Sequence, residues 1–174
     1  MTRWYPVEPA DAGFFETAPH IFRYKKRFAA PPQRVWESLI SDESLAAWGP
    51  SVSRVTWTVP RPFTVGATRE VVLATGIARV RERFFRWDSP GDTAGELGYS
   101  FAVYEANVPF FRHFAEDYRI TPADDHAGAA ASTFTWTVAI EAKPAFALPV
   151  KLLAPVLKAA FGRVAADGQR HFAR

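Results

Sequence analysis

Residues Gly66–Asp88 read GATREVVLATGIARVRERFFRWD, and this segment decides the fold. Its residues alternate as two β-strands hinged at Thr75-Gly76. Residues two apart share one face of a strand, so Glu82 falls in an otherwise apolar row of the second strand. The opposite row of that strand is basic and consists of Arg79, Arg81 and Arg83. A carboxylate in the apolar row would face the interior, where a binding pocket could use it as an acid or base.

A tight turn at the hinge also fixes which residues of the two strands face each other. It pairs Leu73 with Ala78, Val71 with Val80, and Arg69 with Glu82. Any loop with an even number of residues centred there preserves this pairing, whereas an odd loop or a bulge breaks it. The segment therefore predicts that Arg69 is the cross-strand neighbour of Glu82.

The composition of the whole chain indicates one well-filled globular domain. Of its 174 residues, 48% are hydrophobic and 15% aromatic, with six Trp and fifteen Phe. The net charge of +3 is mildly basic and does not demand nucleic acid as a partner. The chain has no cysteine, which excludes disulfides, thiolate nucleophiles and Cys-ligated metals and fits a reducing cytoplasm.

The chain divides into an irregular N-terminal arm, residues 1–19 with three prolines, and a single domain, residues 20–174. The arm has no continuous apolar region, so a secretory signal is not expected. We also expect no run of about 20 apolar residues that would insert stably in a bilayer, and hence a cytoplasmic protein.

The hydrophobic periodicity predicts a largely antiparallel sheet that follows a first strand and two short helices. The first strand is His20–Phe28, the first helix opens at Pro31-Pro32 and runs to about Ser41, and the second is Glu43–Trp48 with Asp42 as its N-cap. Six further strands follow at Ser53–Val59, Ala67–Ala74, Ile77–Trp87, Leu97–Glu105, Phe111–Thr121 and Ser132–Ala142.

A long helix is predicted from Pro149 to about His171. Its apolar residues recur at helical spacing in one stripe made of Leu153, Val156, Leu157, Ala160, Phe161 and Val164. An exposed amphipathic helix of this kind could bind a membrane. Because the preceding sheet needs a cover, we expect the stripe to dock onto the sheet instead.

Several phrases of the sequence resemble one superfamily when they are taken in order. They are AAPPQRVWESL at Ala29–Leu39, VGATREV at Val65–Val71, RERF at Arg81–Phe84 and YRITP at Tyr118–Pro122. Together they resemble the START-like, Bet v 1-like (SRPBCC) superfamily, including bacterial polyketide cyclase/dehydrase-type proteins. The resemblance implies an α+β helix-grip fold, a curved antiparallel sheet of about seven strands wrapped around a long C-terminal helix. It also implies a cavity for an apolar or amphipathic small molecule.

The strand periodicity nominates the residues that would line such a cavity. The inward rows of the later strands carry Tyr99 and Phe101, then Glu116 and Tyr118, then Trp136, although a bulge would turn Glu116 outward. The predicted ligand-binding set is Arg69, Val71, Leu73, Val80, Glu82, Phe84, Tyr99, Phe101, Tyr118, Trp136, Leu157 and Phe161.

The candidates for chemistry are Glu82, Arg69 and Glu116, with Tyr99 and Tyr118 beside them. Glu82 is either a general acid/base or ligand anchor, or one half of a structural ion pair with Arg69. Burial alone would raise its pKa, and a close Arg69 would lower it. Glu116 is a second candidate base. Tyr99 and Tyr118 either stabilise an enolate or belong to the core.

The remaining motifs leave two main functions open. The chain lacks G-x-S-x-G, H-E-x-x-H, a phosphate-cradling loop and a dinucleotide fingerprint, so no metal and no cofactor are expected. The basic rows have their aromatic residues on the opposite face, which disfavours nucleic acid. The favoured function is binding of a hydrophobic small molecule that is lipid-like or polyketide-like. The alternative is a cyclase/aromatase-type enzyme using Glu82, Arg69 or Glu116. A regulatory role has no specific signal, and the oligomeric state stays open.

Overall fold

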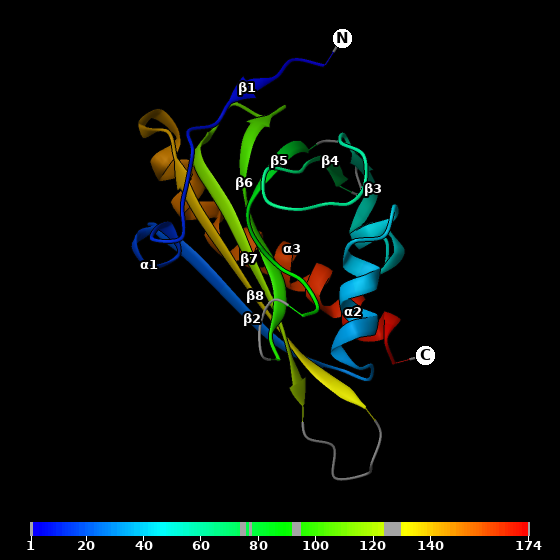
Figure 1. Ribbon diagram of the computed structural model, residues 1–174. Coiled ribbons are helices and arrows are strands. Elements are labelled where there is room, and N and C mark those ends of the chain that lie inside the picture. The colour runs from blue at the N-terminus through cyan, green and yellow to red at the C-terminus, as the bar shows by residue number, and fades with distance from the viewer. Residues whose placement is uncertain (1, 74–75, 77, 92–94, 124–129, 174) are drawn as a thin grey trace.

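One strongly curved antiparallel sheet and one long C-terminal helix form the two layers of the computed structural model (Figure 1). The helix, α3 (Ala147–His171), packs mainly against the strand β2 (His20–Phe28). The structure describes residues 2–73, 76, 78–91, 95–123 and 130–173. These two layers confirm the predicted helix-grip fold.

The sheet places its strands in the order β2-β8-β7-β6-β5-β4-β3, so the chain runs as a meander from β3 to β8 and the first long strand closes onto the last. A two-residue strand, β1 (Tyr5–Pro6), pairs with β6 outside this path. The other strands are β3 (Val52–Trp57), β4 (Thr68–Leu73), β5 (Arg79–Asp88), β6 (Leu97–Ala106), β7 (Phe111–Ala123) and β8 (Ala131–Ala142).

The β4–β5 hairpin has the predicted register. Arg69 pairs with Glu82 and Val71 with Val80, and the backbone N–H of Leu73 donates to the carbonyl of Ala78 at 3.0 Å. Gly76 has a φ of +67°, the left-handed conformation that a tight turn requires. Thr75, the other predicted turn residue, lies outside the described residues.

A bulge on β5 changes which side chains face inward. The pairing of β5 with β6 shifts between Phe84 and Arg86. As a result Trp87, and not Arg86, returns to the inner face, where its ring stacks on Tyr99 at 5.6 Å between centroids.

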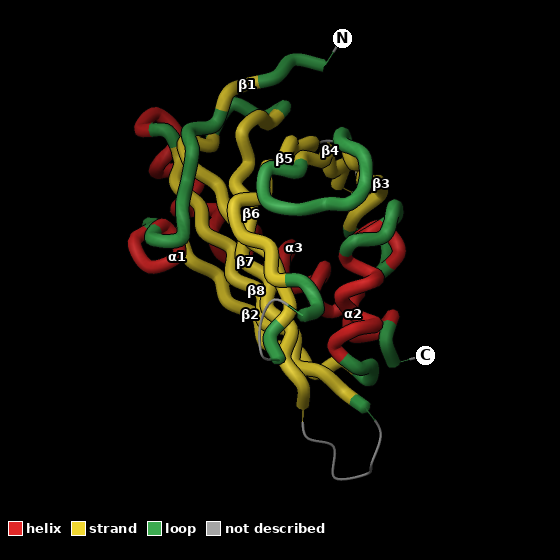
Figure 2. The backbone as a smooth tube through the Cα atoms, in the orientation of Figure 1, coloured by secondary structure: helices red, strands yellow, loops and turns green. Residues whose placement is uncertain are grey.

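Two short helical pieces cover the inner face beside α3. The helix α2 (Pro32–Leu39) buries Val35, Trp36 and Leu39, and Figure 2 shows it on the opposite side of the sheet from the short helix α1 (Phe14–Thr17). The predicted second helix is only a 3-10 turn, η1 (Ser44–Ala47). Its N-cap is Glu43 and not the predicted Asp42, and the hydroxyl of Ser41 accepts the N–H of Ser44 at 2.9 Å. A second 3-10 turn, η2 (Pro144–Phe146), leads into α3.

The N-terminal arm is more regular than predicted and covers the convex face of the sheet. It contains β1 and α1, and Phe15 of α1 is buried with Ala115 and Ala139. Aromatic rings also lie over the basic row of β5. The guanidinium of Arg81 lies 4.0 Å from the ring centre of Trp4, and Arg83 lies over Tyr104. The expectation that this row has no aromatic neighbours is therefore wrong.

The apolar stripe of α3 docks only in part. Val164 is buried and Leu157 and Phe161 are half-buried against the core, but four large apolar side chains are exposed. Their exposed fractions are 65% for Leu148, 71% for Leu152, 53% for Leu153 and 62% for Val156. The prediction for Leu153 and Val156 is wrong because apolar residues occur nearly all round the first half of α3, so spacing alone cannot identify the side that faces the sheet.

One helix among the described residues is long and apolar enough to cross a membrane. It is the segment Pro144–His171, with a mean hydropathy of 1.5 in its most apolar window. The expectation that no apolar run reaches that length is thus wrong on length and composition, although a single such helix is weak support for a membrane span.

The last turns of α3 approach the core so closely that only glycine fits at Gly168. A Cβ there would lie 2.6 Å from Cε3 of Trp48 and 2.9 Å from Cζ of Phe28. We predict that Gly168→Ala lowers the free energy of unfolding by about 1–3 kcal/mol through overpacking. Urea unfolding followed by tryptophan fluorescence measures this loss.

Gly162 of the same helix provides the matched control. A Cβ there would touch only Cε1 of Tyr24, at 3.4 Å, so Gly162→Ala should raise stability by up to ~1 kcal/mol through helix propensity. Equal effects of the two substitutions would contradict the close approach at Gly168.

Candidate functional site

A cavity of about 490 Å³ lies between the inner face of the sheet and α3. Most of its wall is apolar or aromatic, and its polar side chains are few. The lining residues are Leu45, Pro50, Ser51, Val52, Val71, Leu73, Ala78, Val80, Glu82, Val108, Phe110, Phe111, Phe114, Glu116, Tyr118, Trp136, Leu157, Ala160, Phe161, Arg163 and Val164.

The structure divides the predicted site residues into two groups. Those that line the cavity are Val71, Leu73, Val80, Glu82, Glu116, Tyr118, Trp136, Leu157 and Phe161. Those packed behind its wall are Arg69, Phe84, Tyr99 and Phe101, all at most 1% exposed. Their part in ligand binding stays a prediction.

Sequence reasoning missed one wall of the cavity, which comes from loops and strand ends. Pro50 and Ser51 precede β3, and Val108 and Phe110 lie between β6 and β7. No strand period applies in such segments, so only the apolar character of Val108 and Phe110 next to a predicted turn could have pointed to them.

Arg69 and Glu82 form an ion pair that is closed inside the protein. Nε of Arg69 donates to Oε2 of Glu82 at 2.6 Å, and the two residues are 0% and 3% exposed. Nη1 of Arg69 donates to the hydroxyl of Ser44 at 3.1 Å and to that of Tyr99 at 3.4 Å. Nη2 has no hydrogen-bond partner among the described residues. The register alone predicted this pair.

Four aromatic rings enclose the Arg69 guanidinium. Its central carbon lies between 5.0 and 5.4 Å from the ring centres of Trp57, Phe84, Tyr99 and Phe101. Desolvated cation–π contacts stabilise a cation by up to about 2 kcal/mol each. The rings therefore compensate part of the lost hydration and separate the cation from the cavity.

Burial and the charge of the partner act in opposite directions on each member of the pair. Burial opposes the charge on Arg69, but attraction to Glu82 outweighs it and raises the pKa of Arg69. For Glu82, burial raises the pKa, and the charge and hydrogen bond of Arg69 oppose that rise. Because Nε of Arg69 holds Oε2 of Glu82 at 2.6 Å, Glu82 is better placed as an anchor than as a proton donor.

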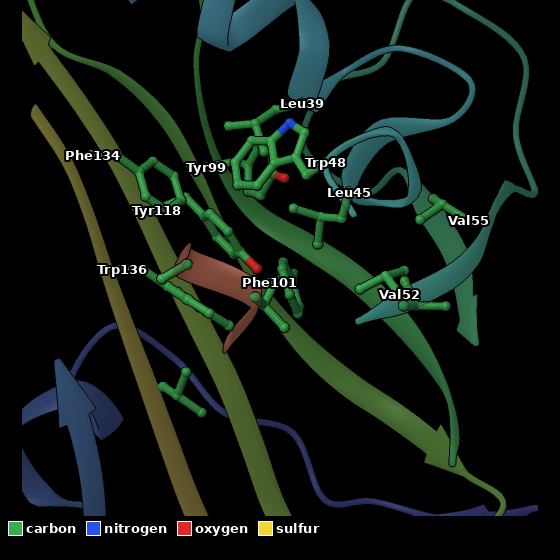
Figure 3. Close-up of a cluster of buried hydrophobic side chains, with 14 of the residues drawn as sticks. Leu39, Leu45, Trp48, Val52, Val55, Tyr99, Phe101, Tyr118, Phe134 and Trp136 are labelled. Atoms are coloured by element: carbon green, nitrogen blue, oxygen red, sulfur yellow. The ribbon is translucent and has the colours of Figure 1, made fainter. Parts of the chain in front are cut away.

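Glu116 faces the cavity, so the open question of its orientation is decided by the structure. Its strand pairs with β8 without a bulge at this position, and Glu116 lies opposite Val138. Its Oε2 accepts hydrogen bonds from the hydroxyl of Tyr118 at 2.7 Å and from Nε1 of Trp136 at 3.0 Å. Figure 3 shows the rings of Tyr118 and Trp136 side by side within the buried cluster.

Glu116 differs from Glu82 in having no ion-pair partner among the described residues. Burial, and then repulsion from Glu82, raise the pKa of Glu116 from 4.5 to about 8, although the Tyr118 hydrogen bond, the charge of Arg69 and the Trp136 hydrogen bond lower it. At neutral pH Glu116 is therefore mostly a neutral acid inside an apolar cavity.

The two candidate tyrosines are buried and have partners. Tyr118 donates to Glu116 and lines the cavity, whereas Tyr99 receives Arg69 and lies behind the wall. Burial raises the pKa of Tyr99 to about 12, so its hydroxyl stays protonated. Among the described residues no three His, Cys, Asp or Glu side chains gather as a metal site, and His126 lies outside these residues.

The sequence matches one family over nearly its whole length. The model of the family described as polyketide cyclase / dehydrase and lipid transport matches residues 19–174. The uncharacterized protein Rv2574 of Mycobacterium tuberculosis is 33% identical over 135 residues, covering 78% of this chain and 74% of that protein. The uncharacterized protein Mb2604 of Mycobacterium bovis matches over the same share at the same identity.

Solved structures share the fold at low sequence identity. TTHA0849 from Thermus thermophilus aligns with a TM-score of 0.64 at 17% identity, covering 88% of this chain and 97% of that one. Ara h 8.0201 aligns with a TM-score of 0.58 at 14% identity, covering 89% of this chain and 99% of that one. Truncated norcoclaurine synthase from Thalictrum flavum aligns with a TM-score of 0.58 at 12% identity, covering 85% of this chain and 89% of that one. Together with the family match, these likenesses confirm the predicted superfamily and fold.

The buried ion pair predicts a large penalty for removing one partner. Arg69→Met leaves Glu82 buried without a counter-charge and should lower the free energy of unfolding by about 3–5 kcal/mol. The double variant Arg69→Met/Glu82→Gln should recover most of that loss, since no buried charge is then left unpaired. Urea unfolding at pH 7 of the four proteins of this cycle measures the coupling.

Arg81 of the same hairpin is the control. It pairs with Glu70 and Glu105 on the convex face, and its side chain is 34% exposed. Arg81→Met should cost less than about 1 kcal/mol. A loss for Arg69→Met as small as that for Arg81→Met would show that the interior pair is not a coupled unit.

Proposed function

Because the chain belongs to the polyketide cyclase / dehydrase and lipid transport family, we propose that it binds a hydrophobic or amphipathic small molecule in the cavity under α3. The observation that carries the proposal is the cavity itself. Its volume of about 490 Å³ and its mostly apolar wall with a few convergent polar groups are typical of small-molecule sites.

The wall suggests how such a ligand would lie. Val71, Val80, Leu157 and Phe161 offer apolar surface on two sides of the cavity, from β4, β5 and α3. Burying an apolar ligand there gains about 25 cal/mol per Å² of apolar surface. The carboxylates of Glu82 and Glu116 then meet the polar end of the ligand, while Arg69 positions Glu82 from behind.

Filling the mouth of the cavity tests the proposal. Ala160 lies on α3, is exposed and also lines the cavity, so a larger side chain fits there without entering the core. We predict that Ala160→Trp weakens binding of an uncharged environment-sensitive fluorophore such as N-phenyl-1-naphthylamine by about tenfold, or 1.4 kcal/mol. A fluorescence titration measures the dissociation constant.

Ala159 is the neighbouring exposed position that does not line the cavity. Ala159→Trp should leave the dissociation constant unchanged. If the native protein does not bind the fluorophore saturably, or if both tryptophans act alike, the cavity is not the binding site.

A second candidate function is catalysis of the cyclase/aromatase type. The observation that favours it is that two carboxyls of one cavity have different partners, since Glu82 pairs with Arg69 and Glu116 accepts from Tyr118 and Trp136. Such a pair could supply a proton donor and a base to a polyketide-like substrate.

Turnover separates this candidate from binding alone. A poly-β-keto thioester incubated with the protein should yield an aromatic product that absorbs in the ultraviolet. Glu116→Gln should lower the rate of product formation by about 10²-fold or more, because a positioned general acid accelerates a reaction by at least that factor. Binding without any product would reject the enzyme and leave the carrier.

A further inference from the structure

The carboxylates of the cavity have hydrogen-bonding capacity that the protein does not fill. Glu82 and Glu116 are 3% and 6% exposed and both line the cavity. Oε2 of each accepts hydrogen bonds from protein side chains. No hydrogen bond among the described residues reaches Oε1 of either residue, and neither Oε1 is one of the buried side-chain atoms that lack a partner. Each Oε1 is therefore open to the cavity, where a ligand can donate to it once the carboxyl is ionised.

The polar donors deep in the cavity are already occupied. Tyr118 and Trp136 both donate to Oε2 of Glu116. The donors of Arg69 lie behind the wall: Nε and Nη1 are used, and Nη2, which has no partner among the described residues, is buried among the aromatic rings and does not reach the cavity. Arg163 also lines the cavity, but it is exposed and therefore lies at the open side. Among the described residues, a carboxylate ligand would find no free cation at depth.

The charge balance of the interior points the same way. The titratable groups that act on Glu116 from neighbouring elements are Glu82, Arg69, Tyr118, Tyr99 and Tyr24. With Arg69 positive, Glu82 negative and Glu116 neutral, the buried groups around the cavity sum to no net charge, and Arg163 adds a positive charge only at the open side. A buried anionic head would leave one uncompensated negative charge at low dielectric, which costs several kcal/mol.

We propose that the cavity selects amphiphiles whose buried end is an amine, held by the free oxygens of Glu82 and Glu116, and rejects matched carboxylates. This inference rests on the proposed binding function and names its ligand class. An alkylammonium ion enters, Glu116 releases its proton to solvent, and N–H···O hydrogen bonds form to the carboxylates. Arg69, Glu82, Glu116 and the ligand then again sum to zero charge.

The competing ligand chemistries make different use of these atoms. A neutral alcohol can donate to one oxygen only, and it leaves Glu116 protonated. A carboxylate can pair with Arg163 only at the open side. At depth it can accept only the O–H of neutral Glu116, and its charge then stays uncompensated beside Glu82. The expected order of affinity at pH 7 is therefore amine, then alcohol, then carboxylate.

Competition with the uncharged fluorophore tests this order on the intact protein. Dodecylamine, dodecanol and dodecanoate are titrated below their micelle-forming concentrations, so only the head group differs. We expect dodecylamine to displace the fluorophore at a concentration at least about tenfold lower than dodecanoate. Dodecanoate that competes as well as dodecylamine or better would overturn the inference while fluorophore binding, and with it the proposed function, stands. Absence of fluorophore binding would instead reject the proposed function.

The pH dependence provides a readout on the native protein that needs no variant. Below the Glu116 pKa of about 8, each ammonium ion that binds displaces one proton. Apparent affinity for dodecylamine should therefore rise about tenfold per pH unit from pH 6 and level off near pH 8. Affinity for dodecanol should not rise in this range. An affinity for dodecylamine that is flat with pH would contradict the role of Glu116.

Glu116→Gln, which keeps the shape of the side chain and an oxygen acceptor for Tyr118 and Trp136, should abolish the preference for dodecylamine and its pH dependence, both measured against dodecanol in the same variant. Glu105→Gln is the control, because Glu105 pairs with Arg81 on the convex face. It should leave the order of the three ligands unchanged, and a loss of preference in both variants would contradict the assignment to Glu116.

Discussion

A guanidinium without contact to water needs a counter-charge, and Arg69 finds it 2.6 Å away on the neighbouring strand. This interaction links elements that the sheet alone would not hold together, since Arg69 of β4 also contacts Ser44 of η1 and Tyr99 of β6. Removing two charges from water is costly, and the attraction between them roughly offsets that cost. The pair therefore contributes little net stability. It favours the one β4–β5 register in which Arg69 and Glu82 face each other, and this register builds the inner wall of the cavity.

The same pair determines the state of the second carboxyl group. Because Arg69 pairs with Glu82, Glu116 has no ion-pair partner among the described residues, and it lies among Tyr118, Trp136 and apolar walls. Its neutral form is then favoured, with a pKa of about 8. One ion pair and one neutral acid give a cavity with no net charge and with two oxygen atoms free for a ligand. Both the carrier function and its enzymatic alternative depend on this difference between two residues of the same type.

The parts of the fold with a strict period could be predicted from the sequence, and the parts without one could not. The alternation of apolar and polar residues in β4 and β5, with an even number of turn residues between them, was enough to predict that Arg69 pairs with Glu82. Spacing could not identify the docked side of α3, because apolar residues surround its first half. The bulge that turns Trp87 inward has no local signal. The neutral state of Glu116 depends on its burial, on the nearby Glu82 and on partners from two strands, which no single segment contains.

The central claim is that Arg69 holds Glu82 ionised and thereby leaves Glu116 neutral. A pH titration of the side-chain carboxyl carbons by ¹³C NMR tests it directly, with Glu82→Gln and Glu116→Gln used to assign the two signals. The account predicts that the Glu116 signal titrates near pH 8 and that the Glu82 signal is that of a carboxylate at pH 7. A Glu116 signal that titrates near the ordinary value of 4.5, or a Glu82 signal that is protonated at pH 7, would contradict it.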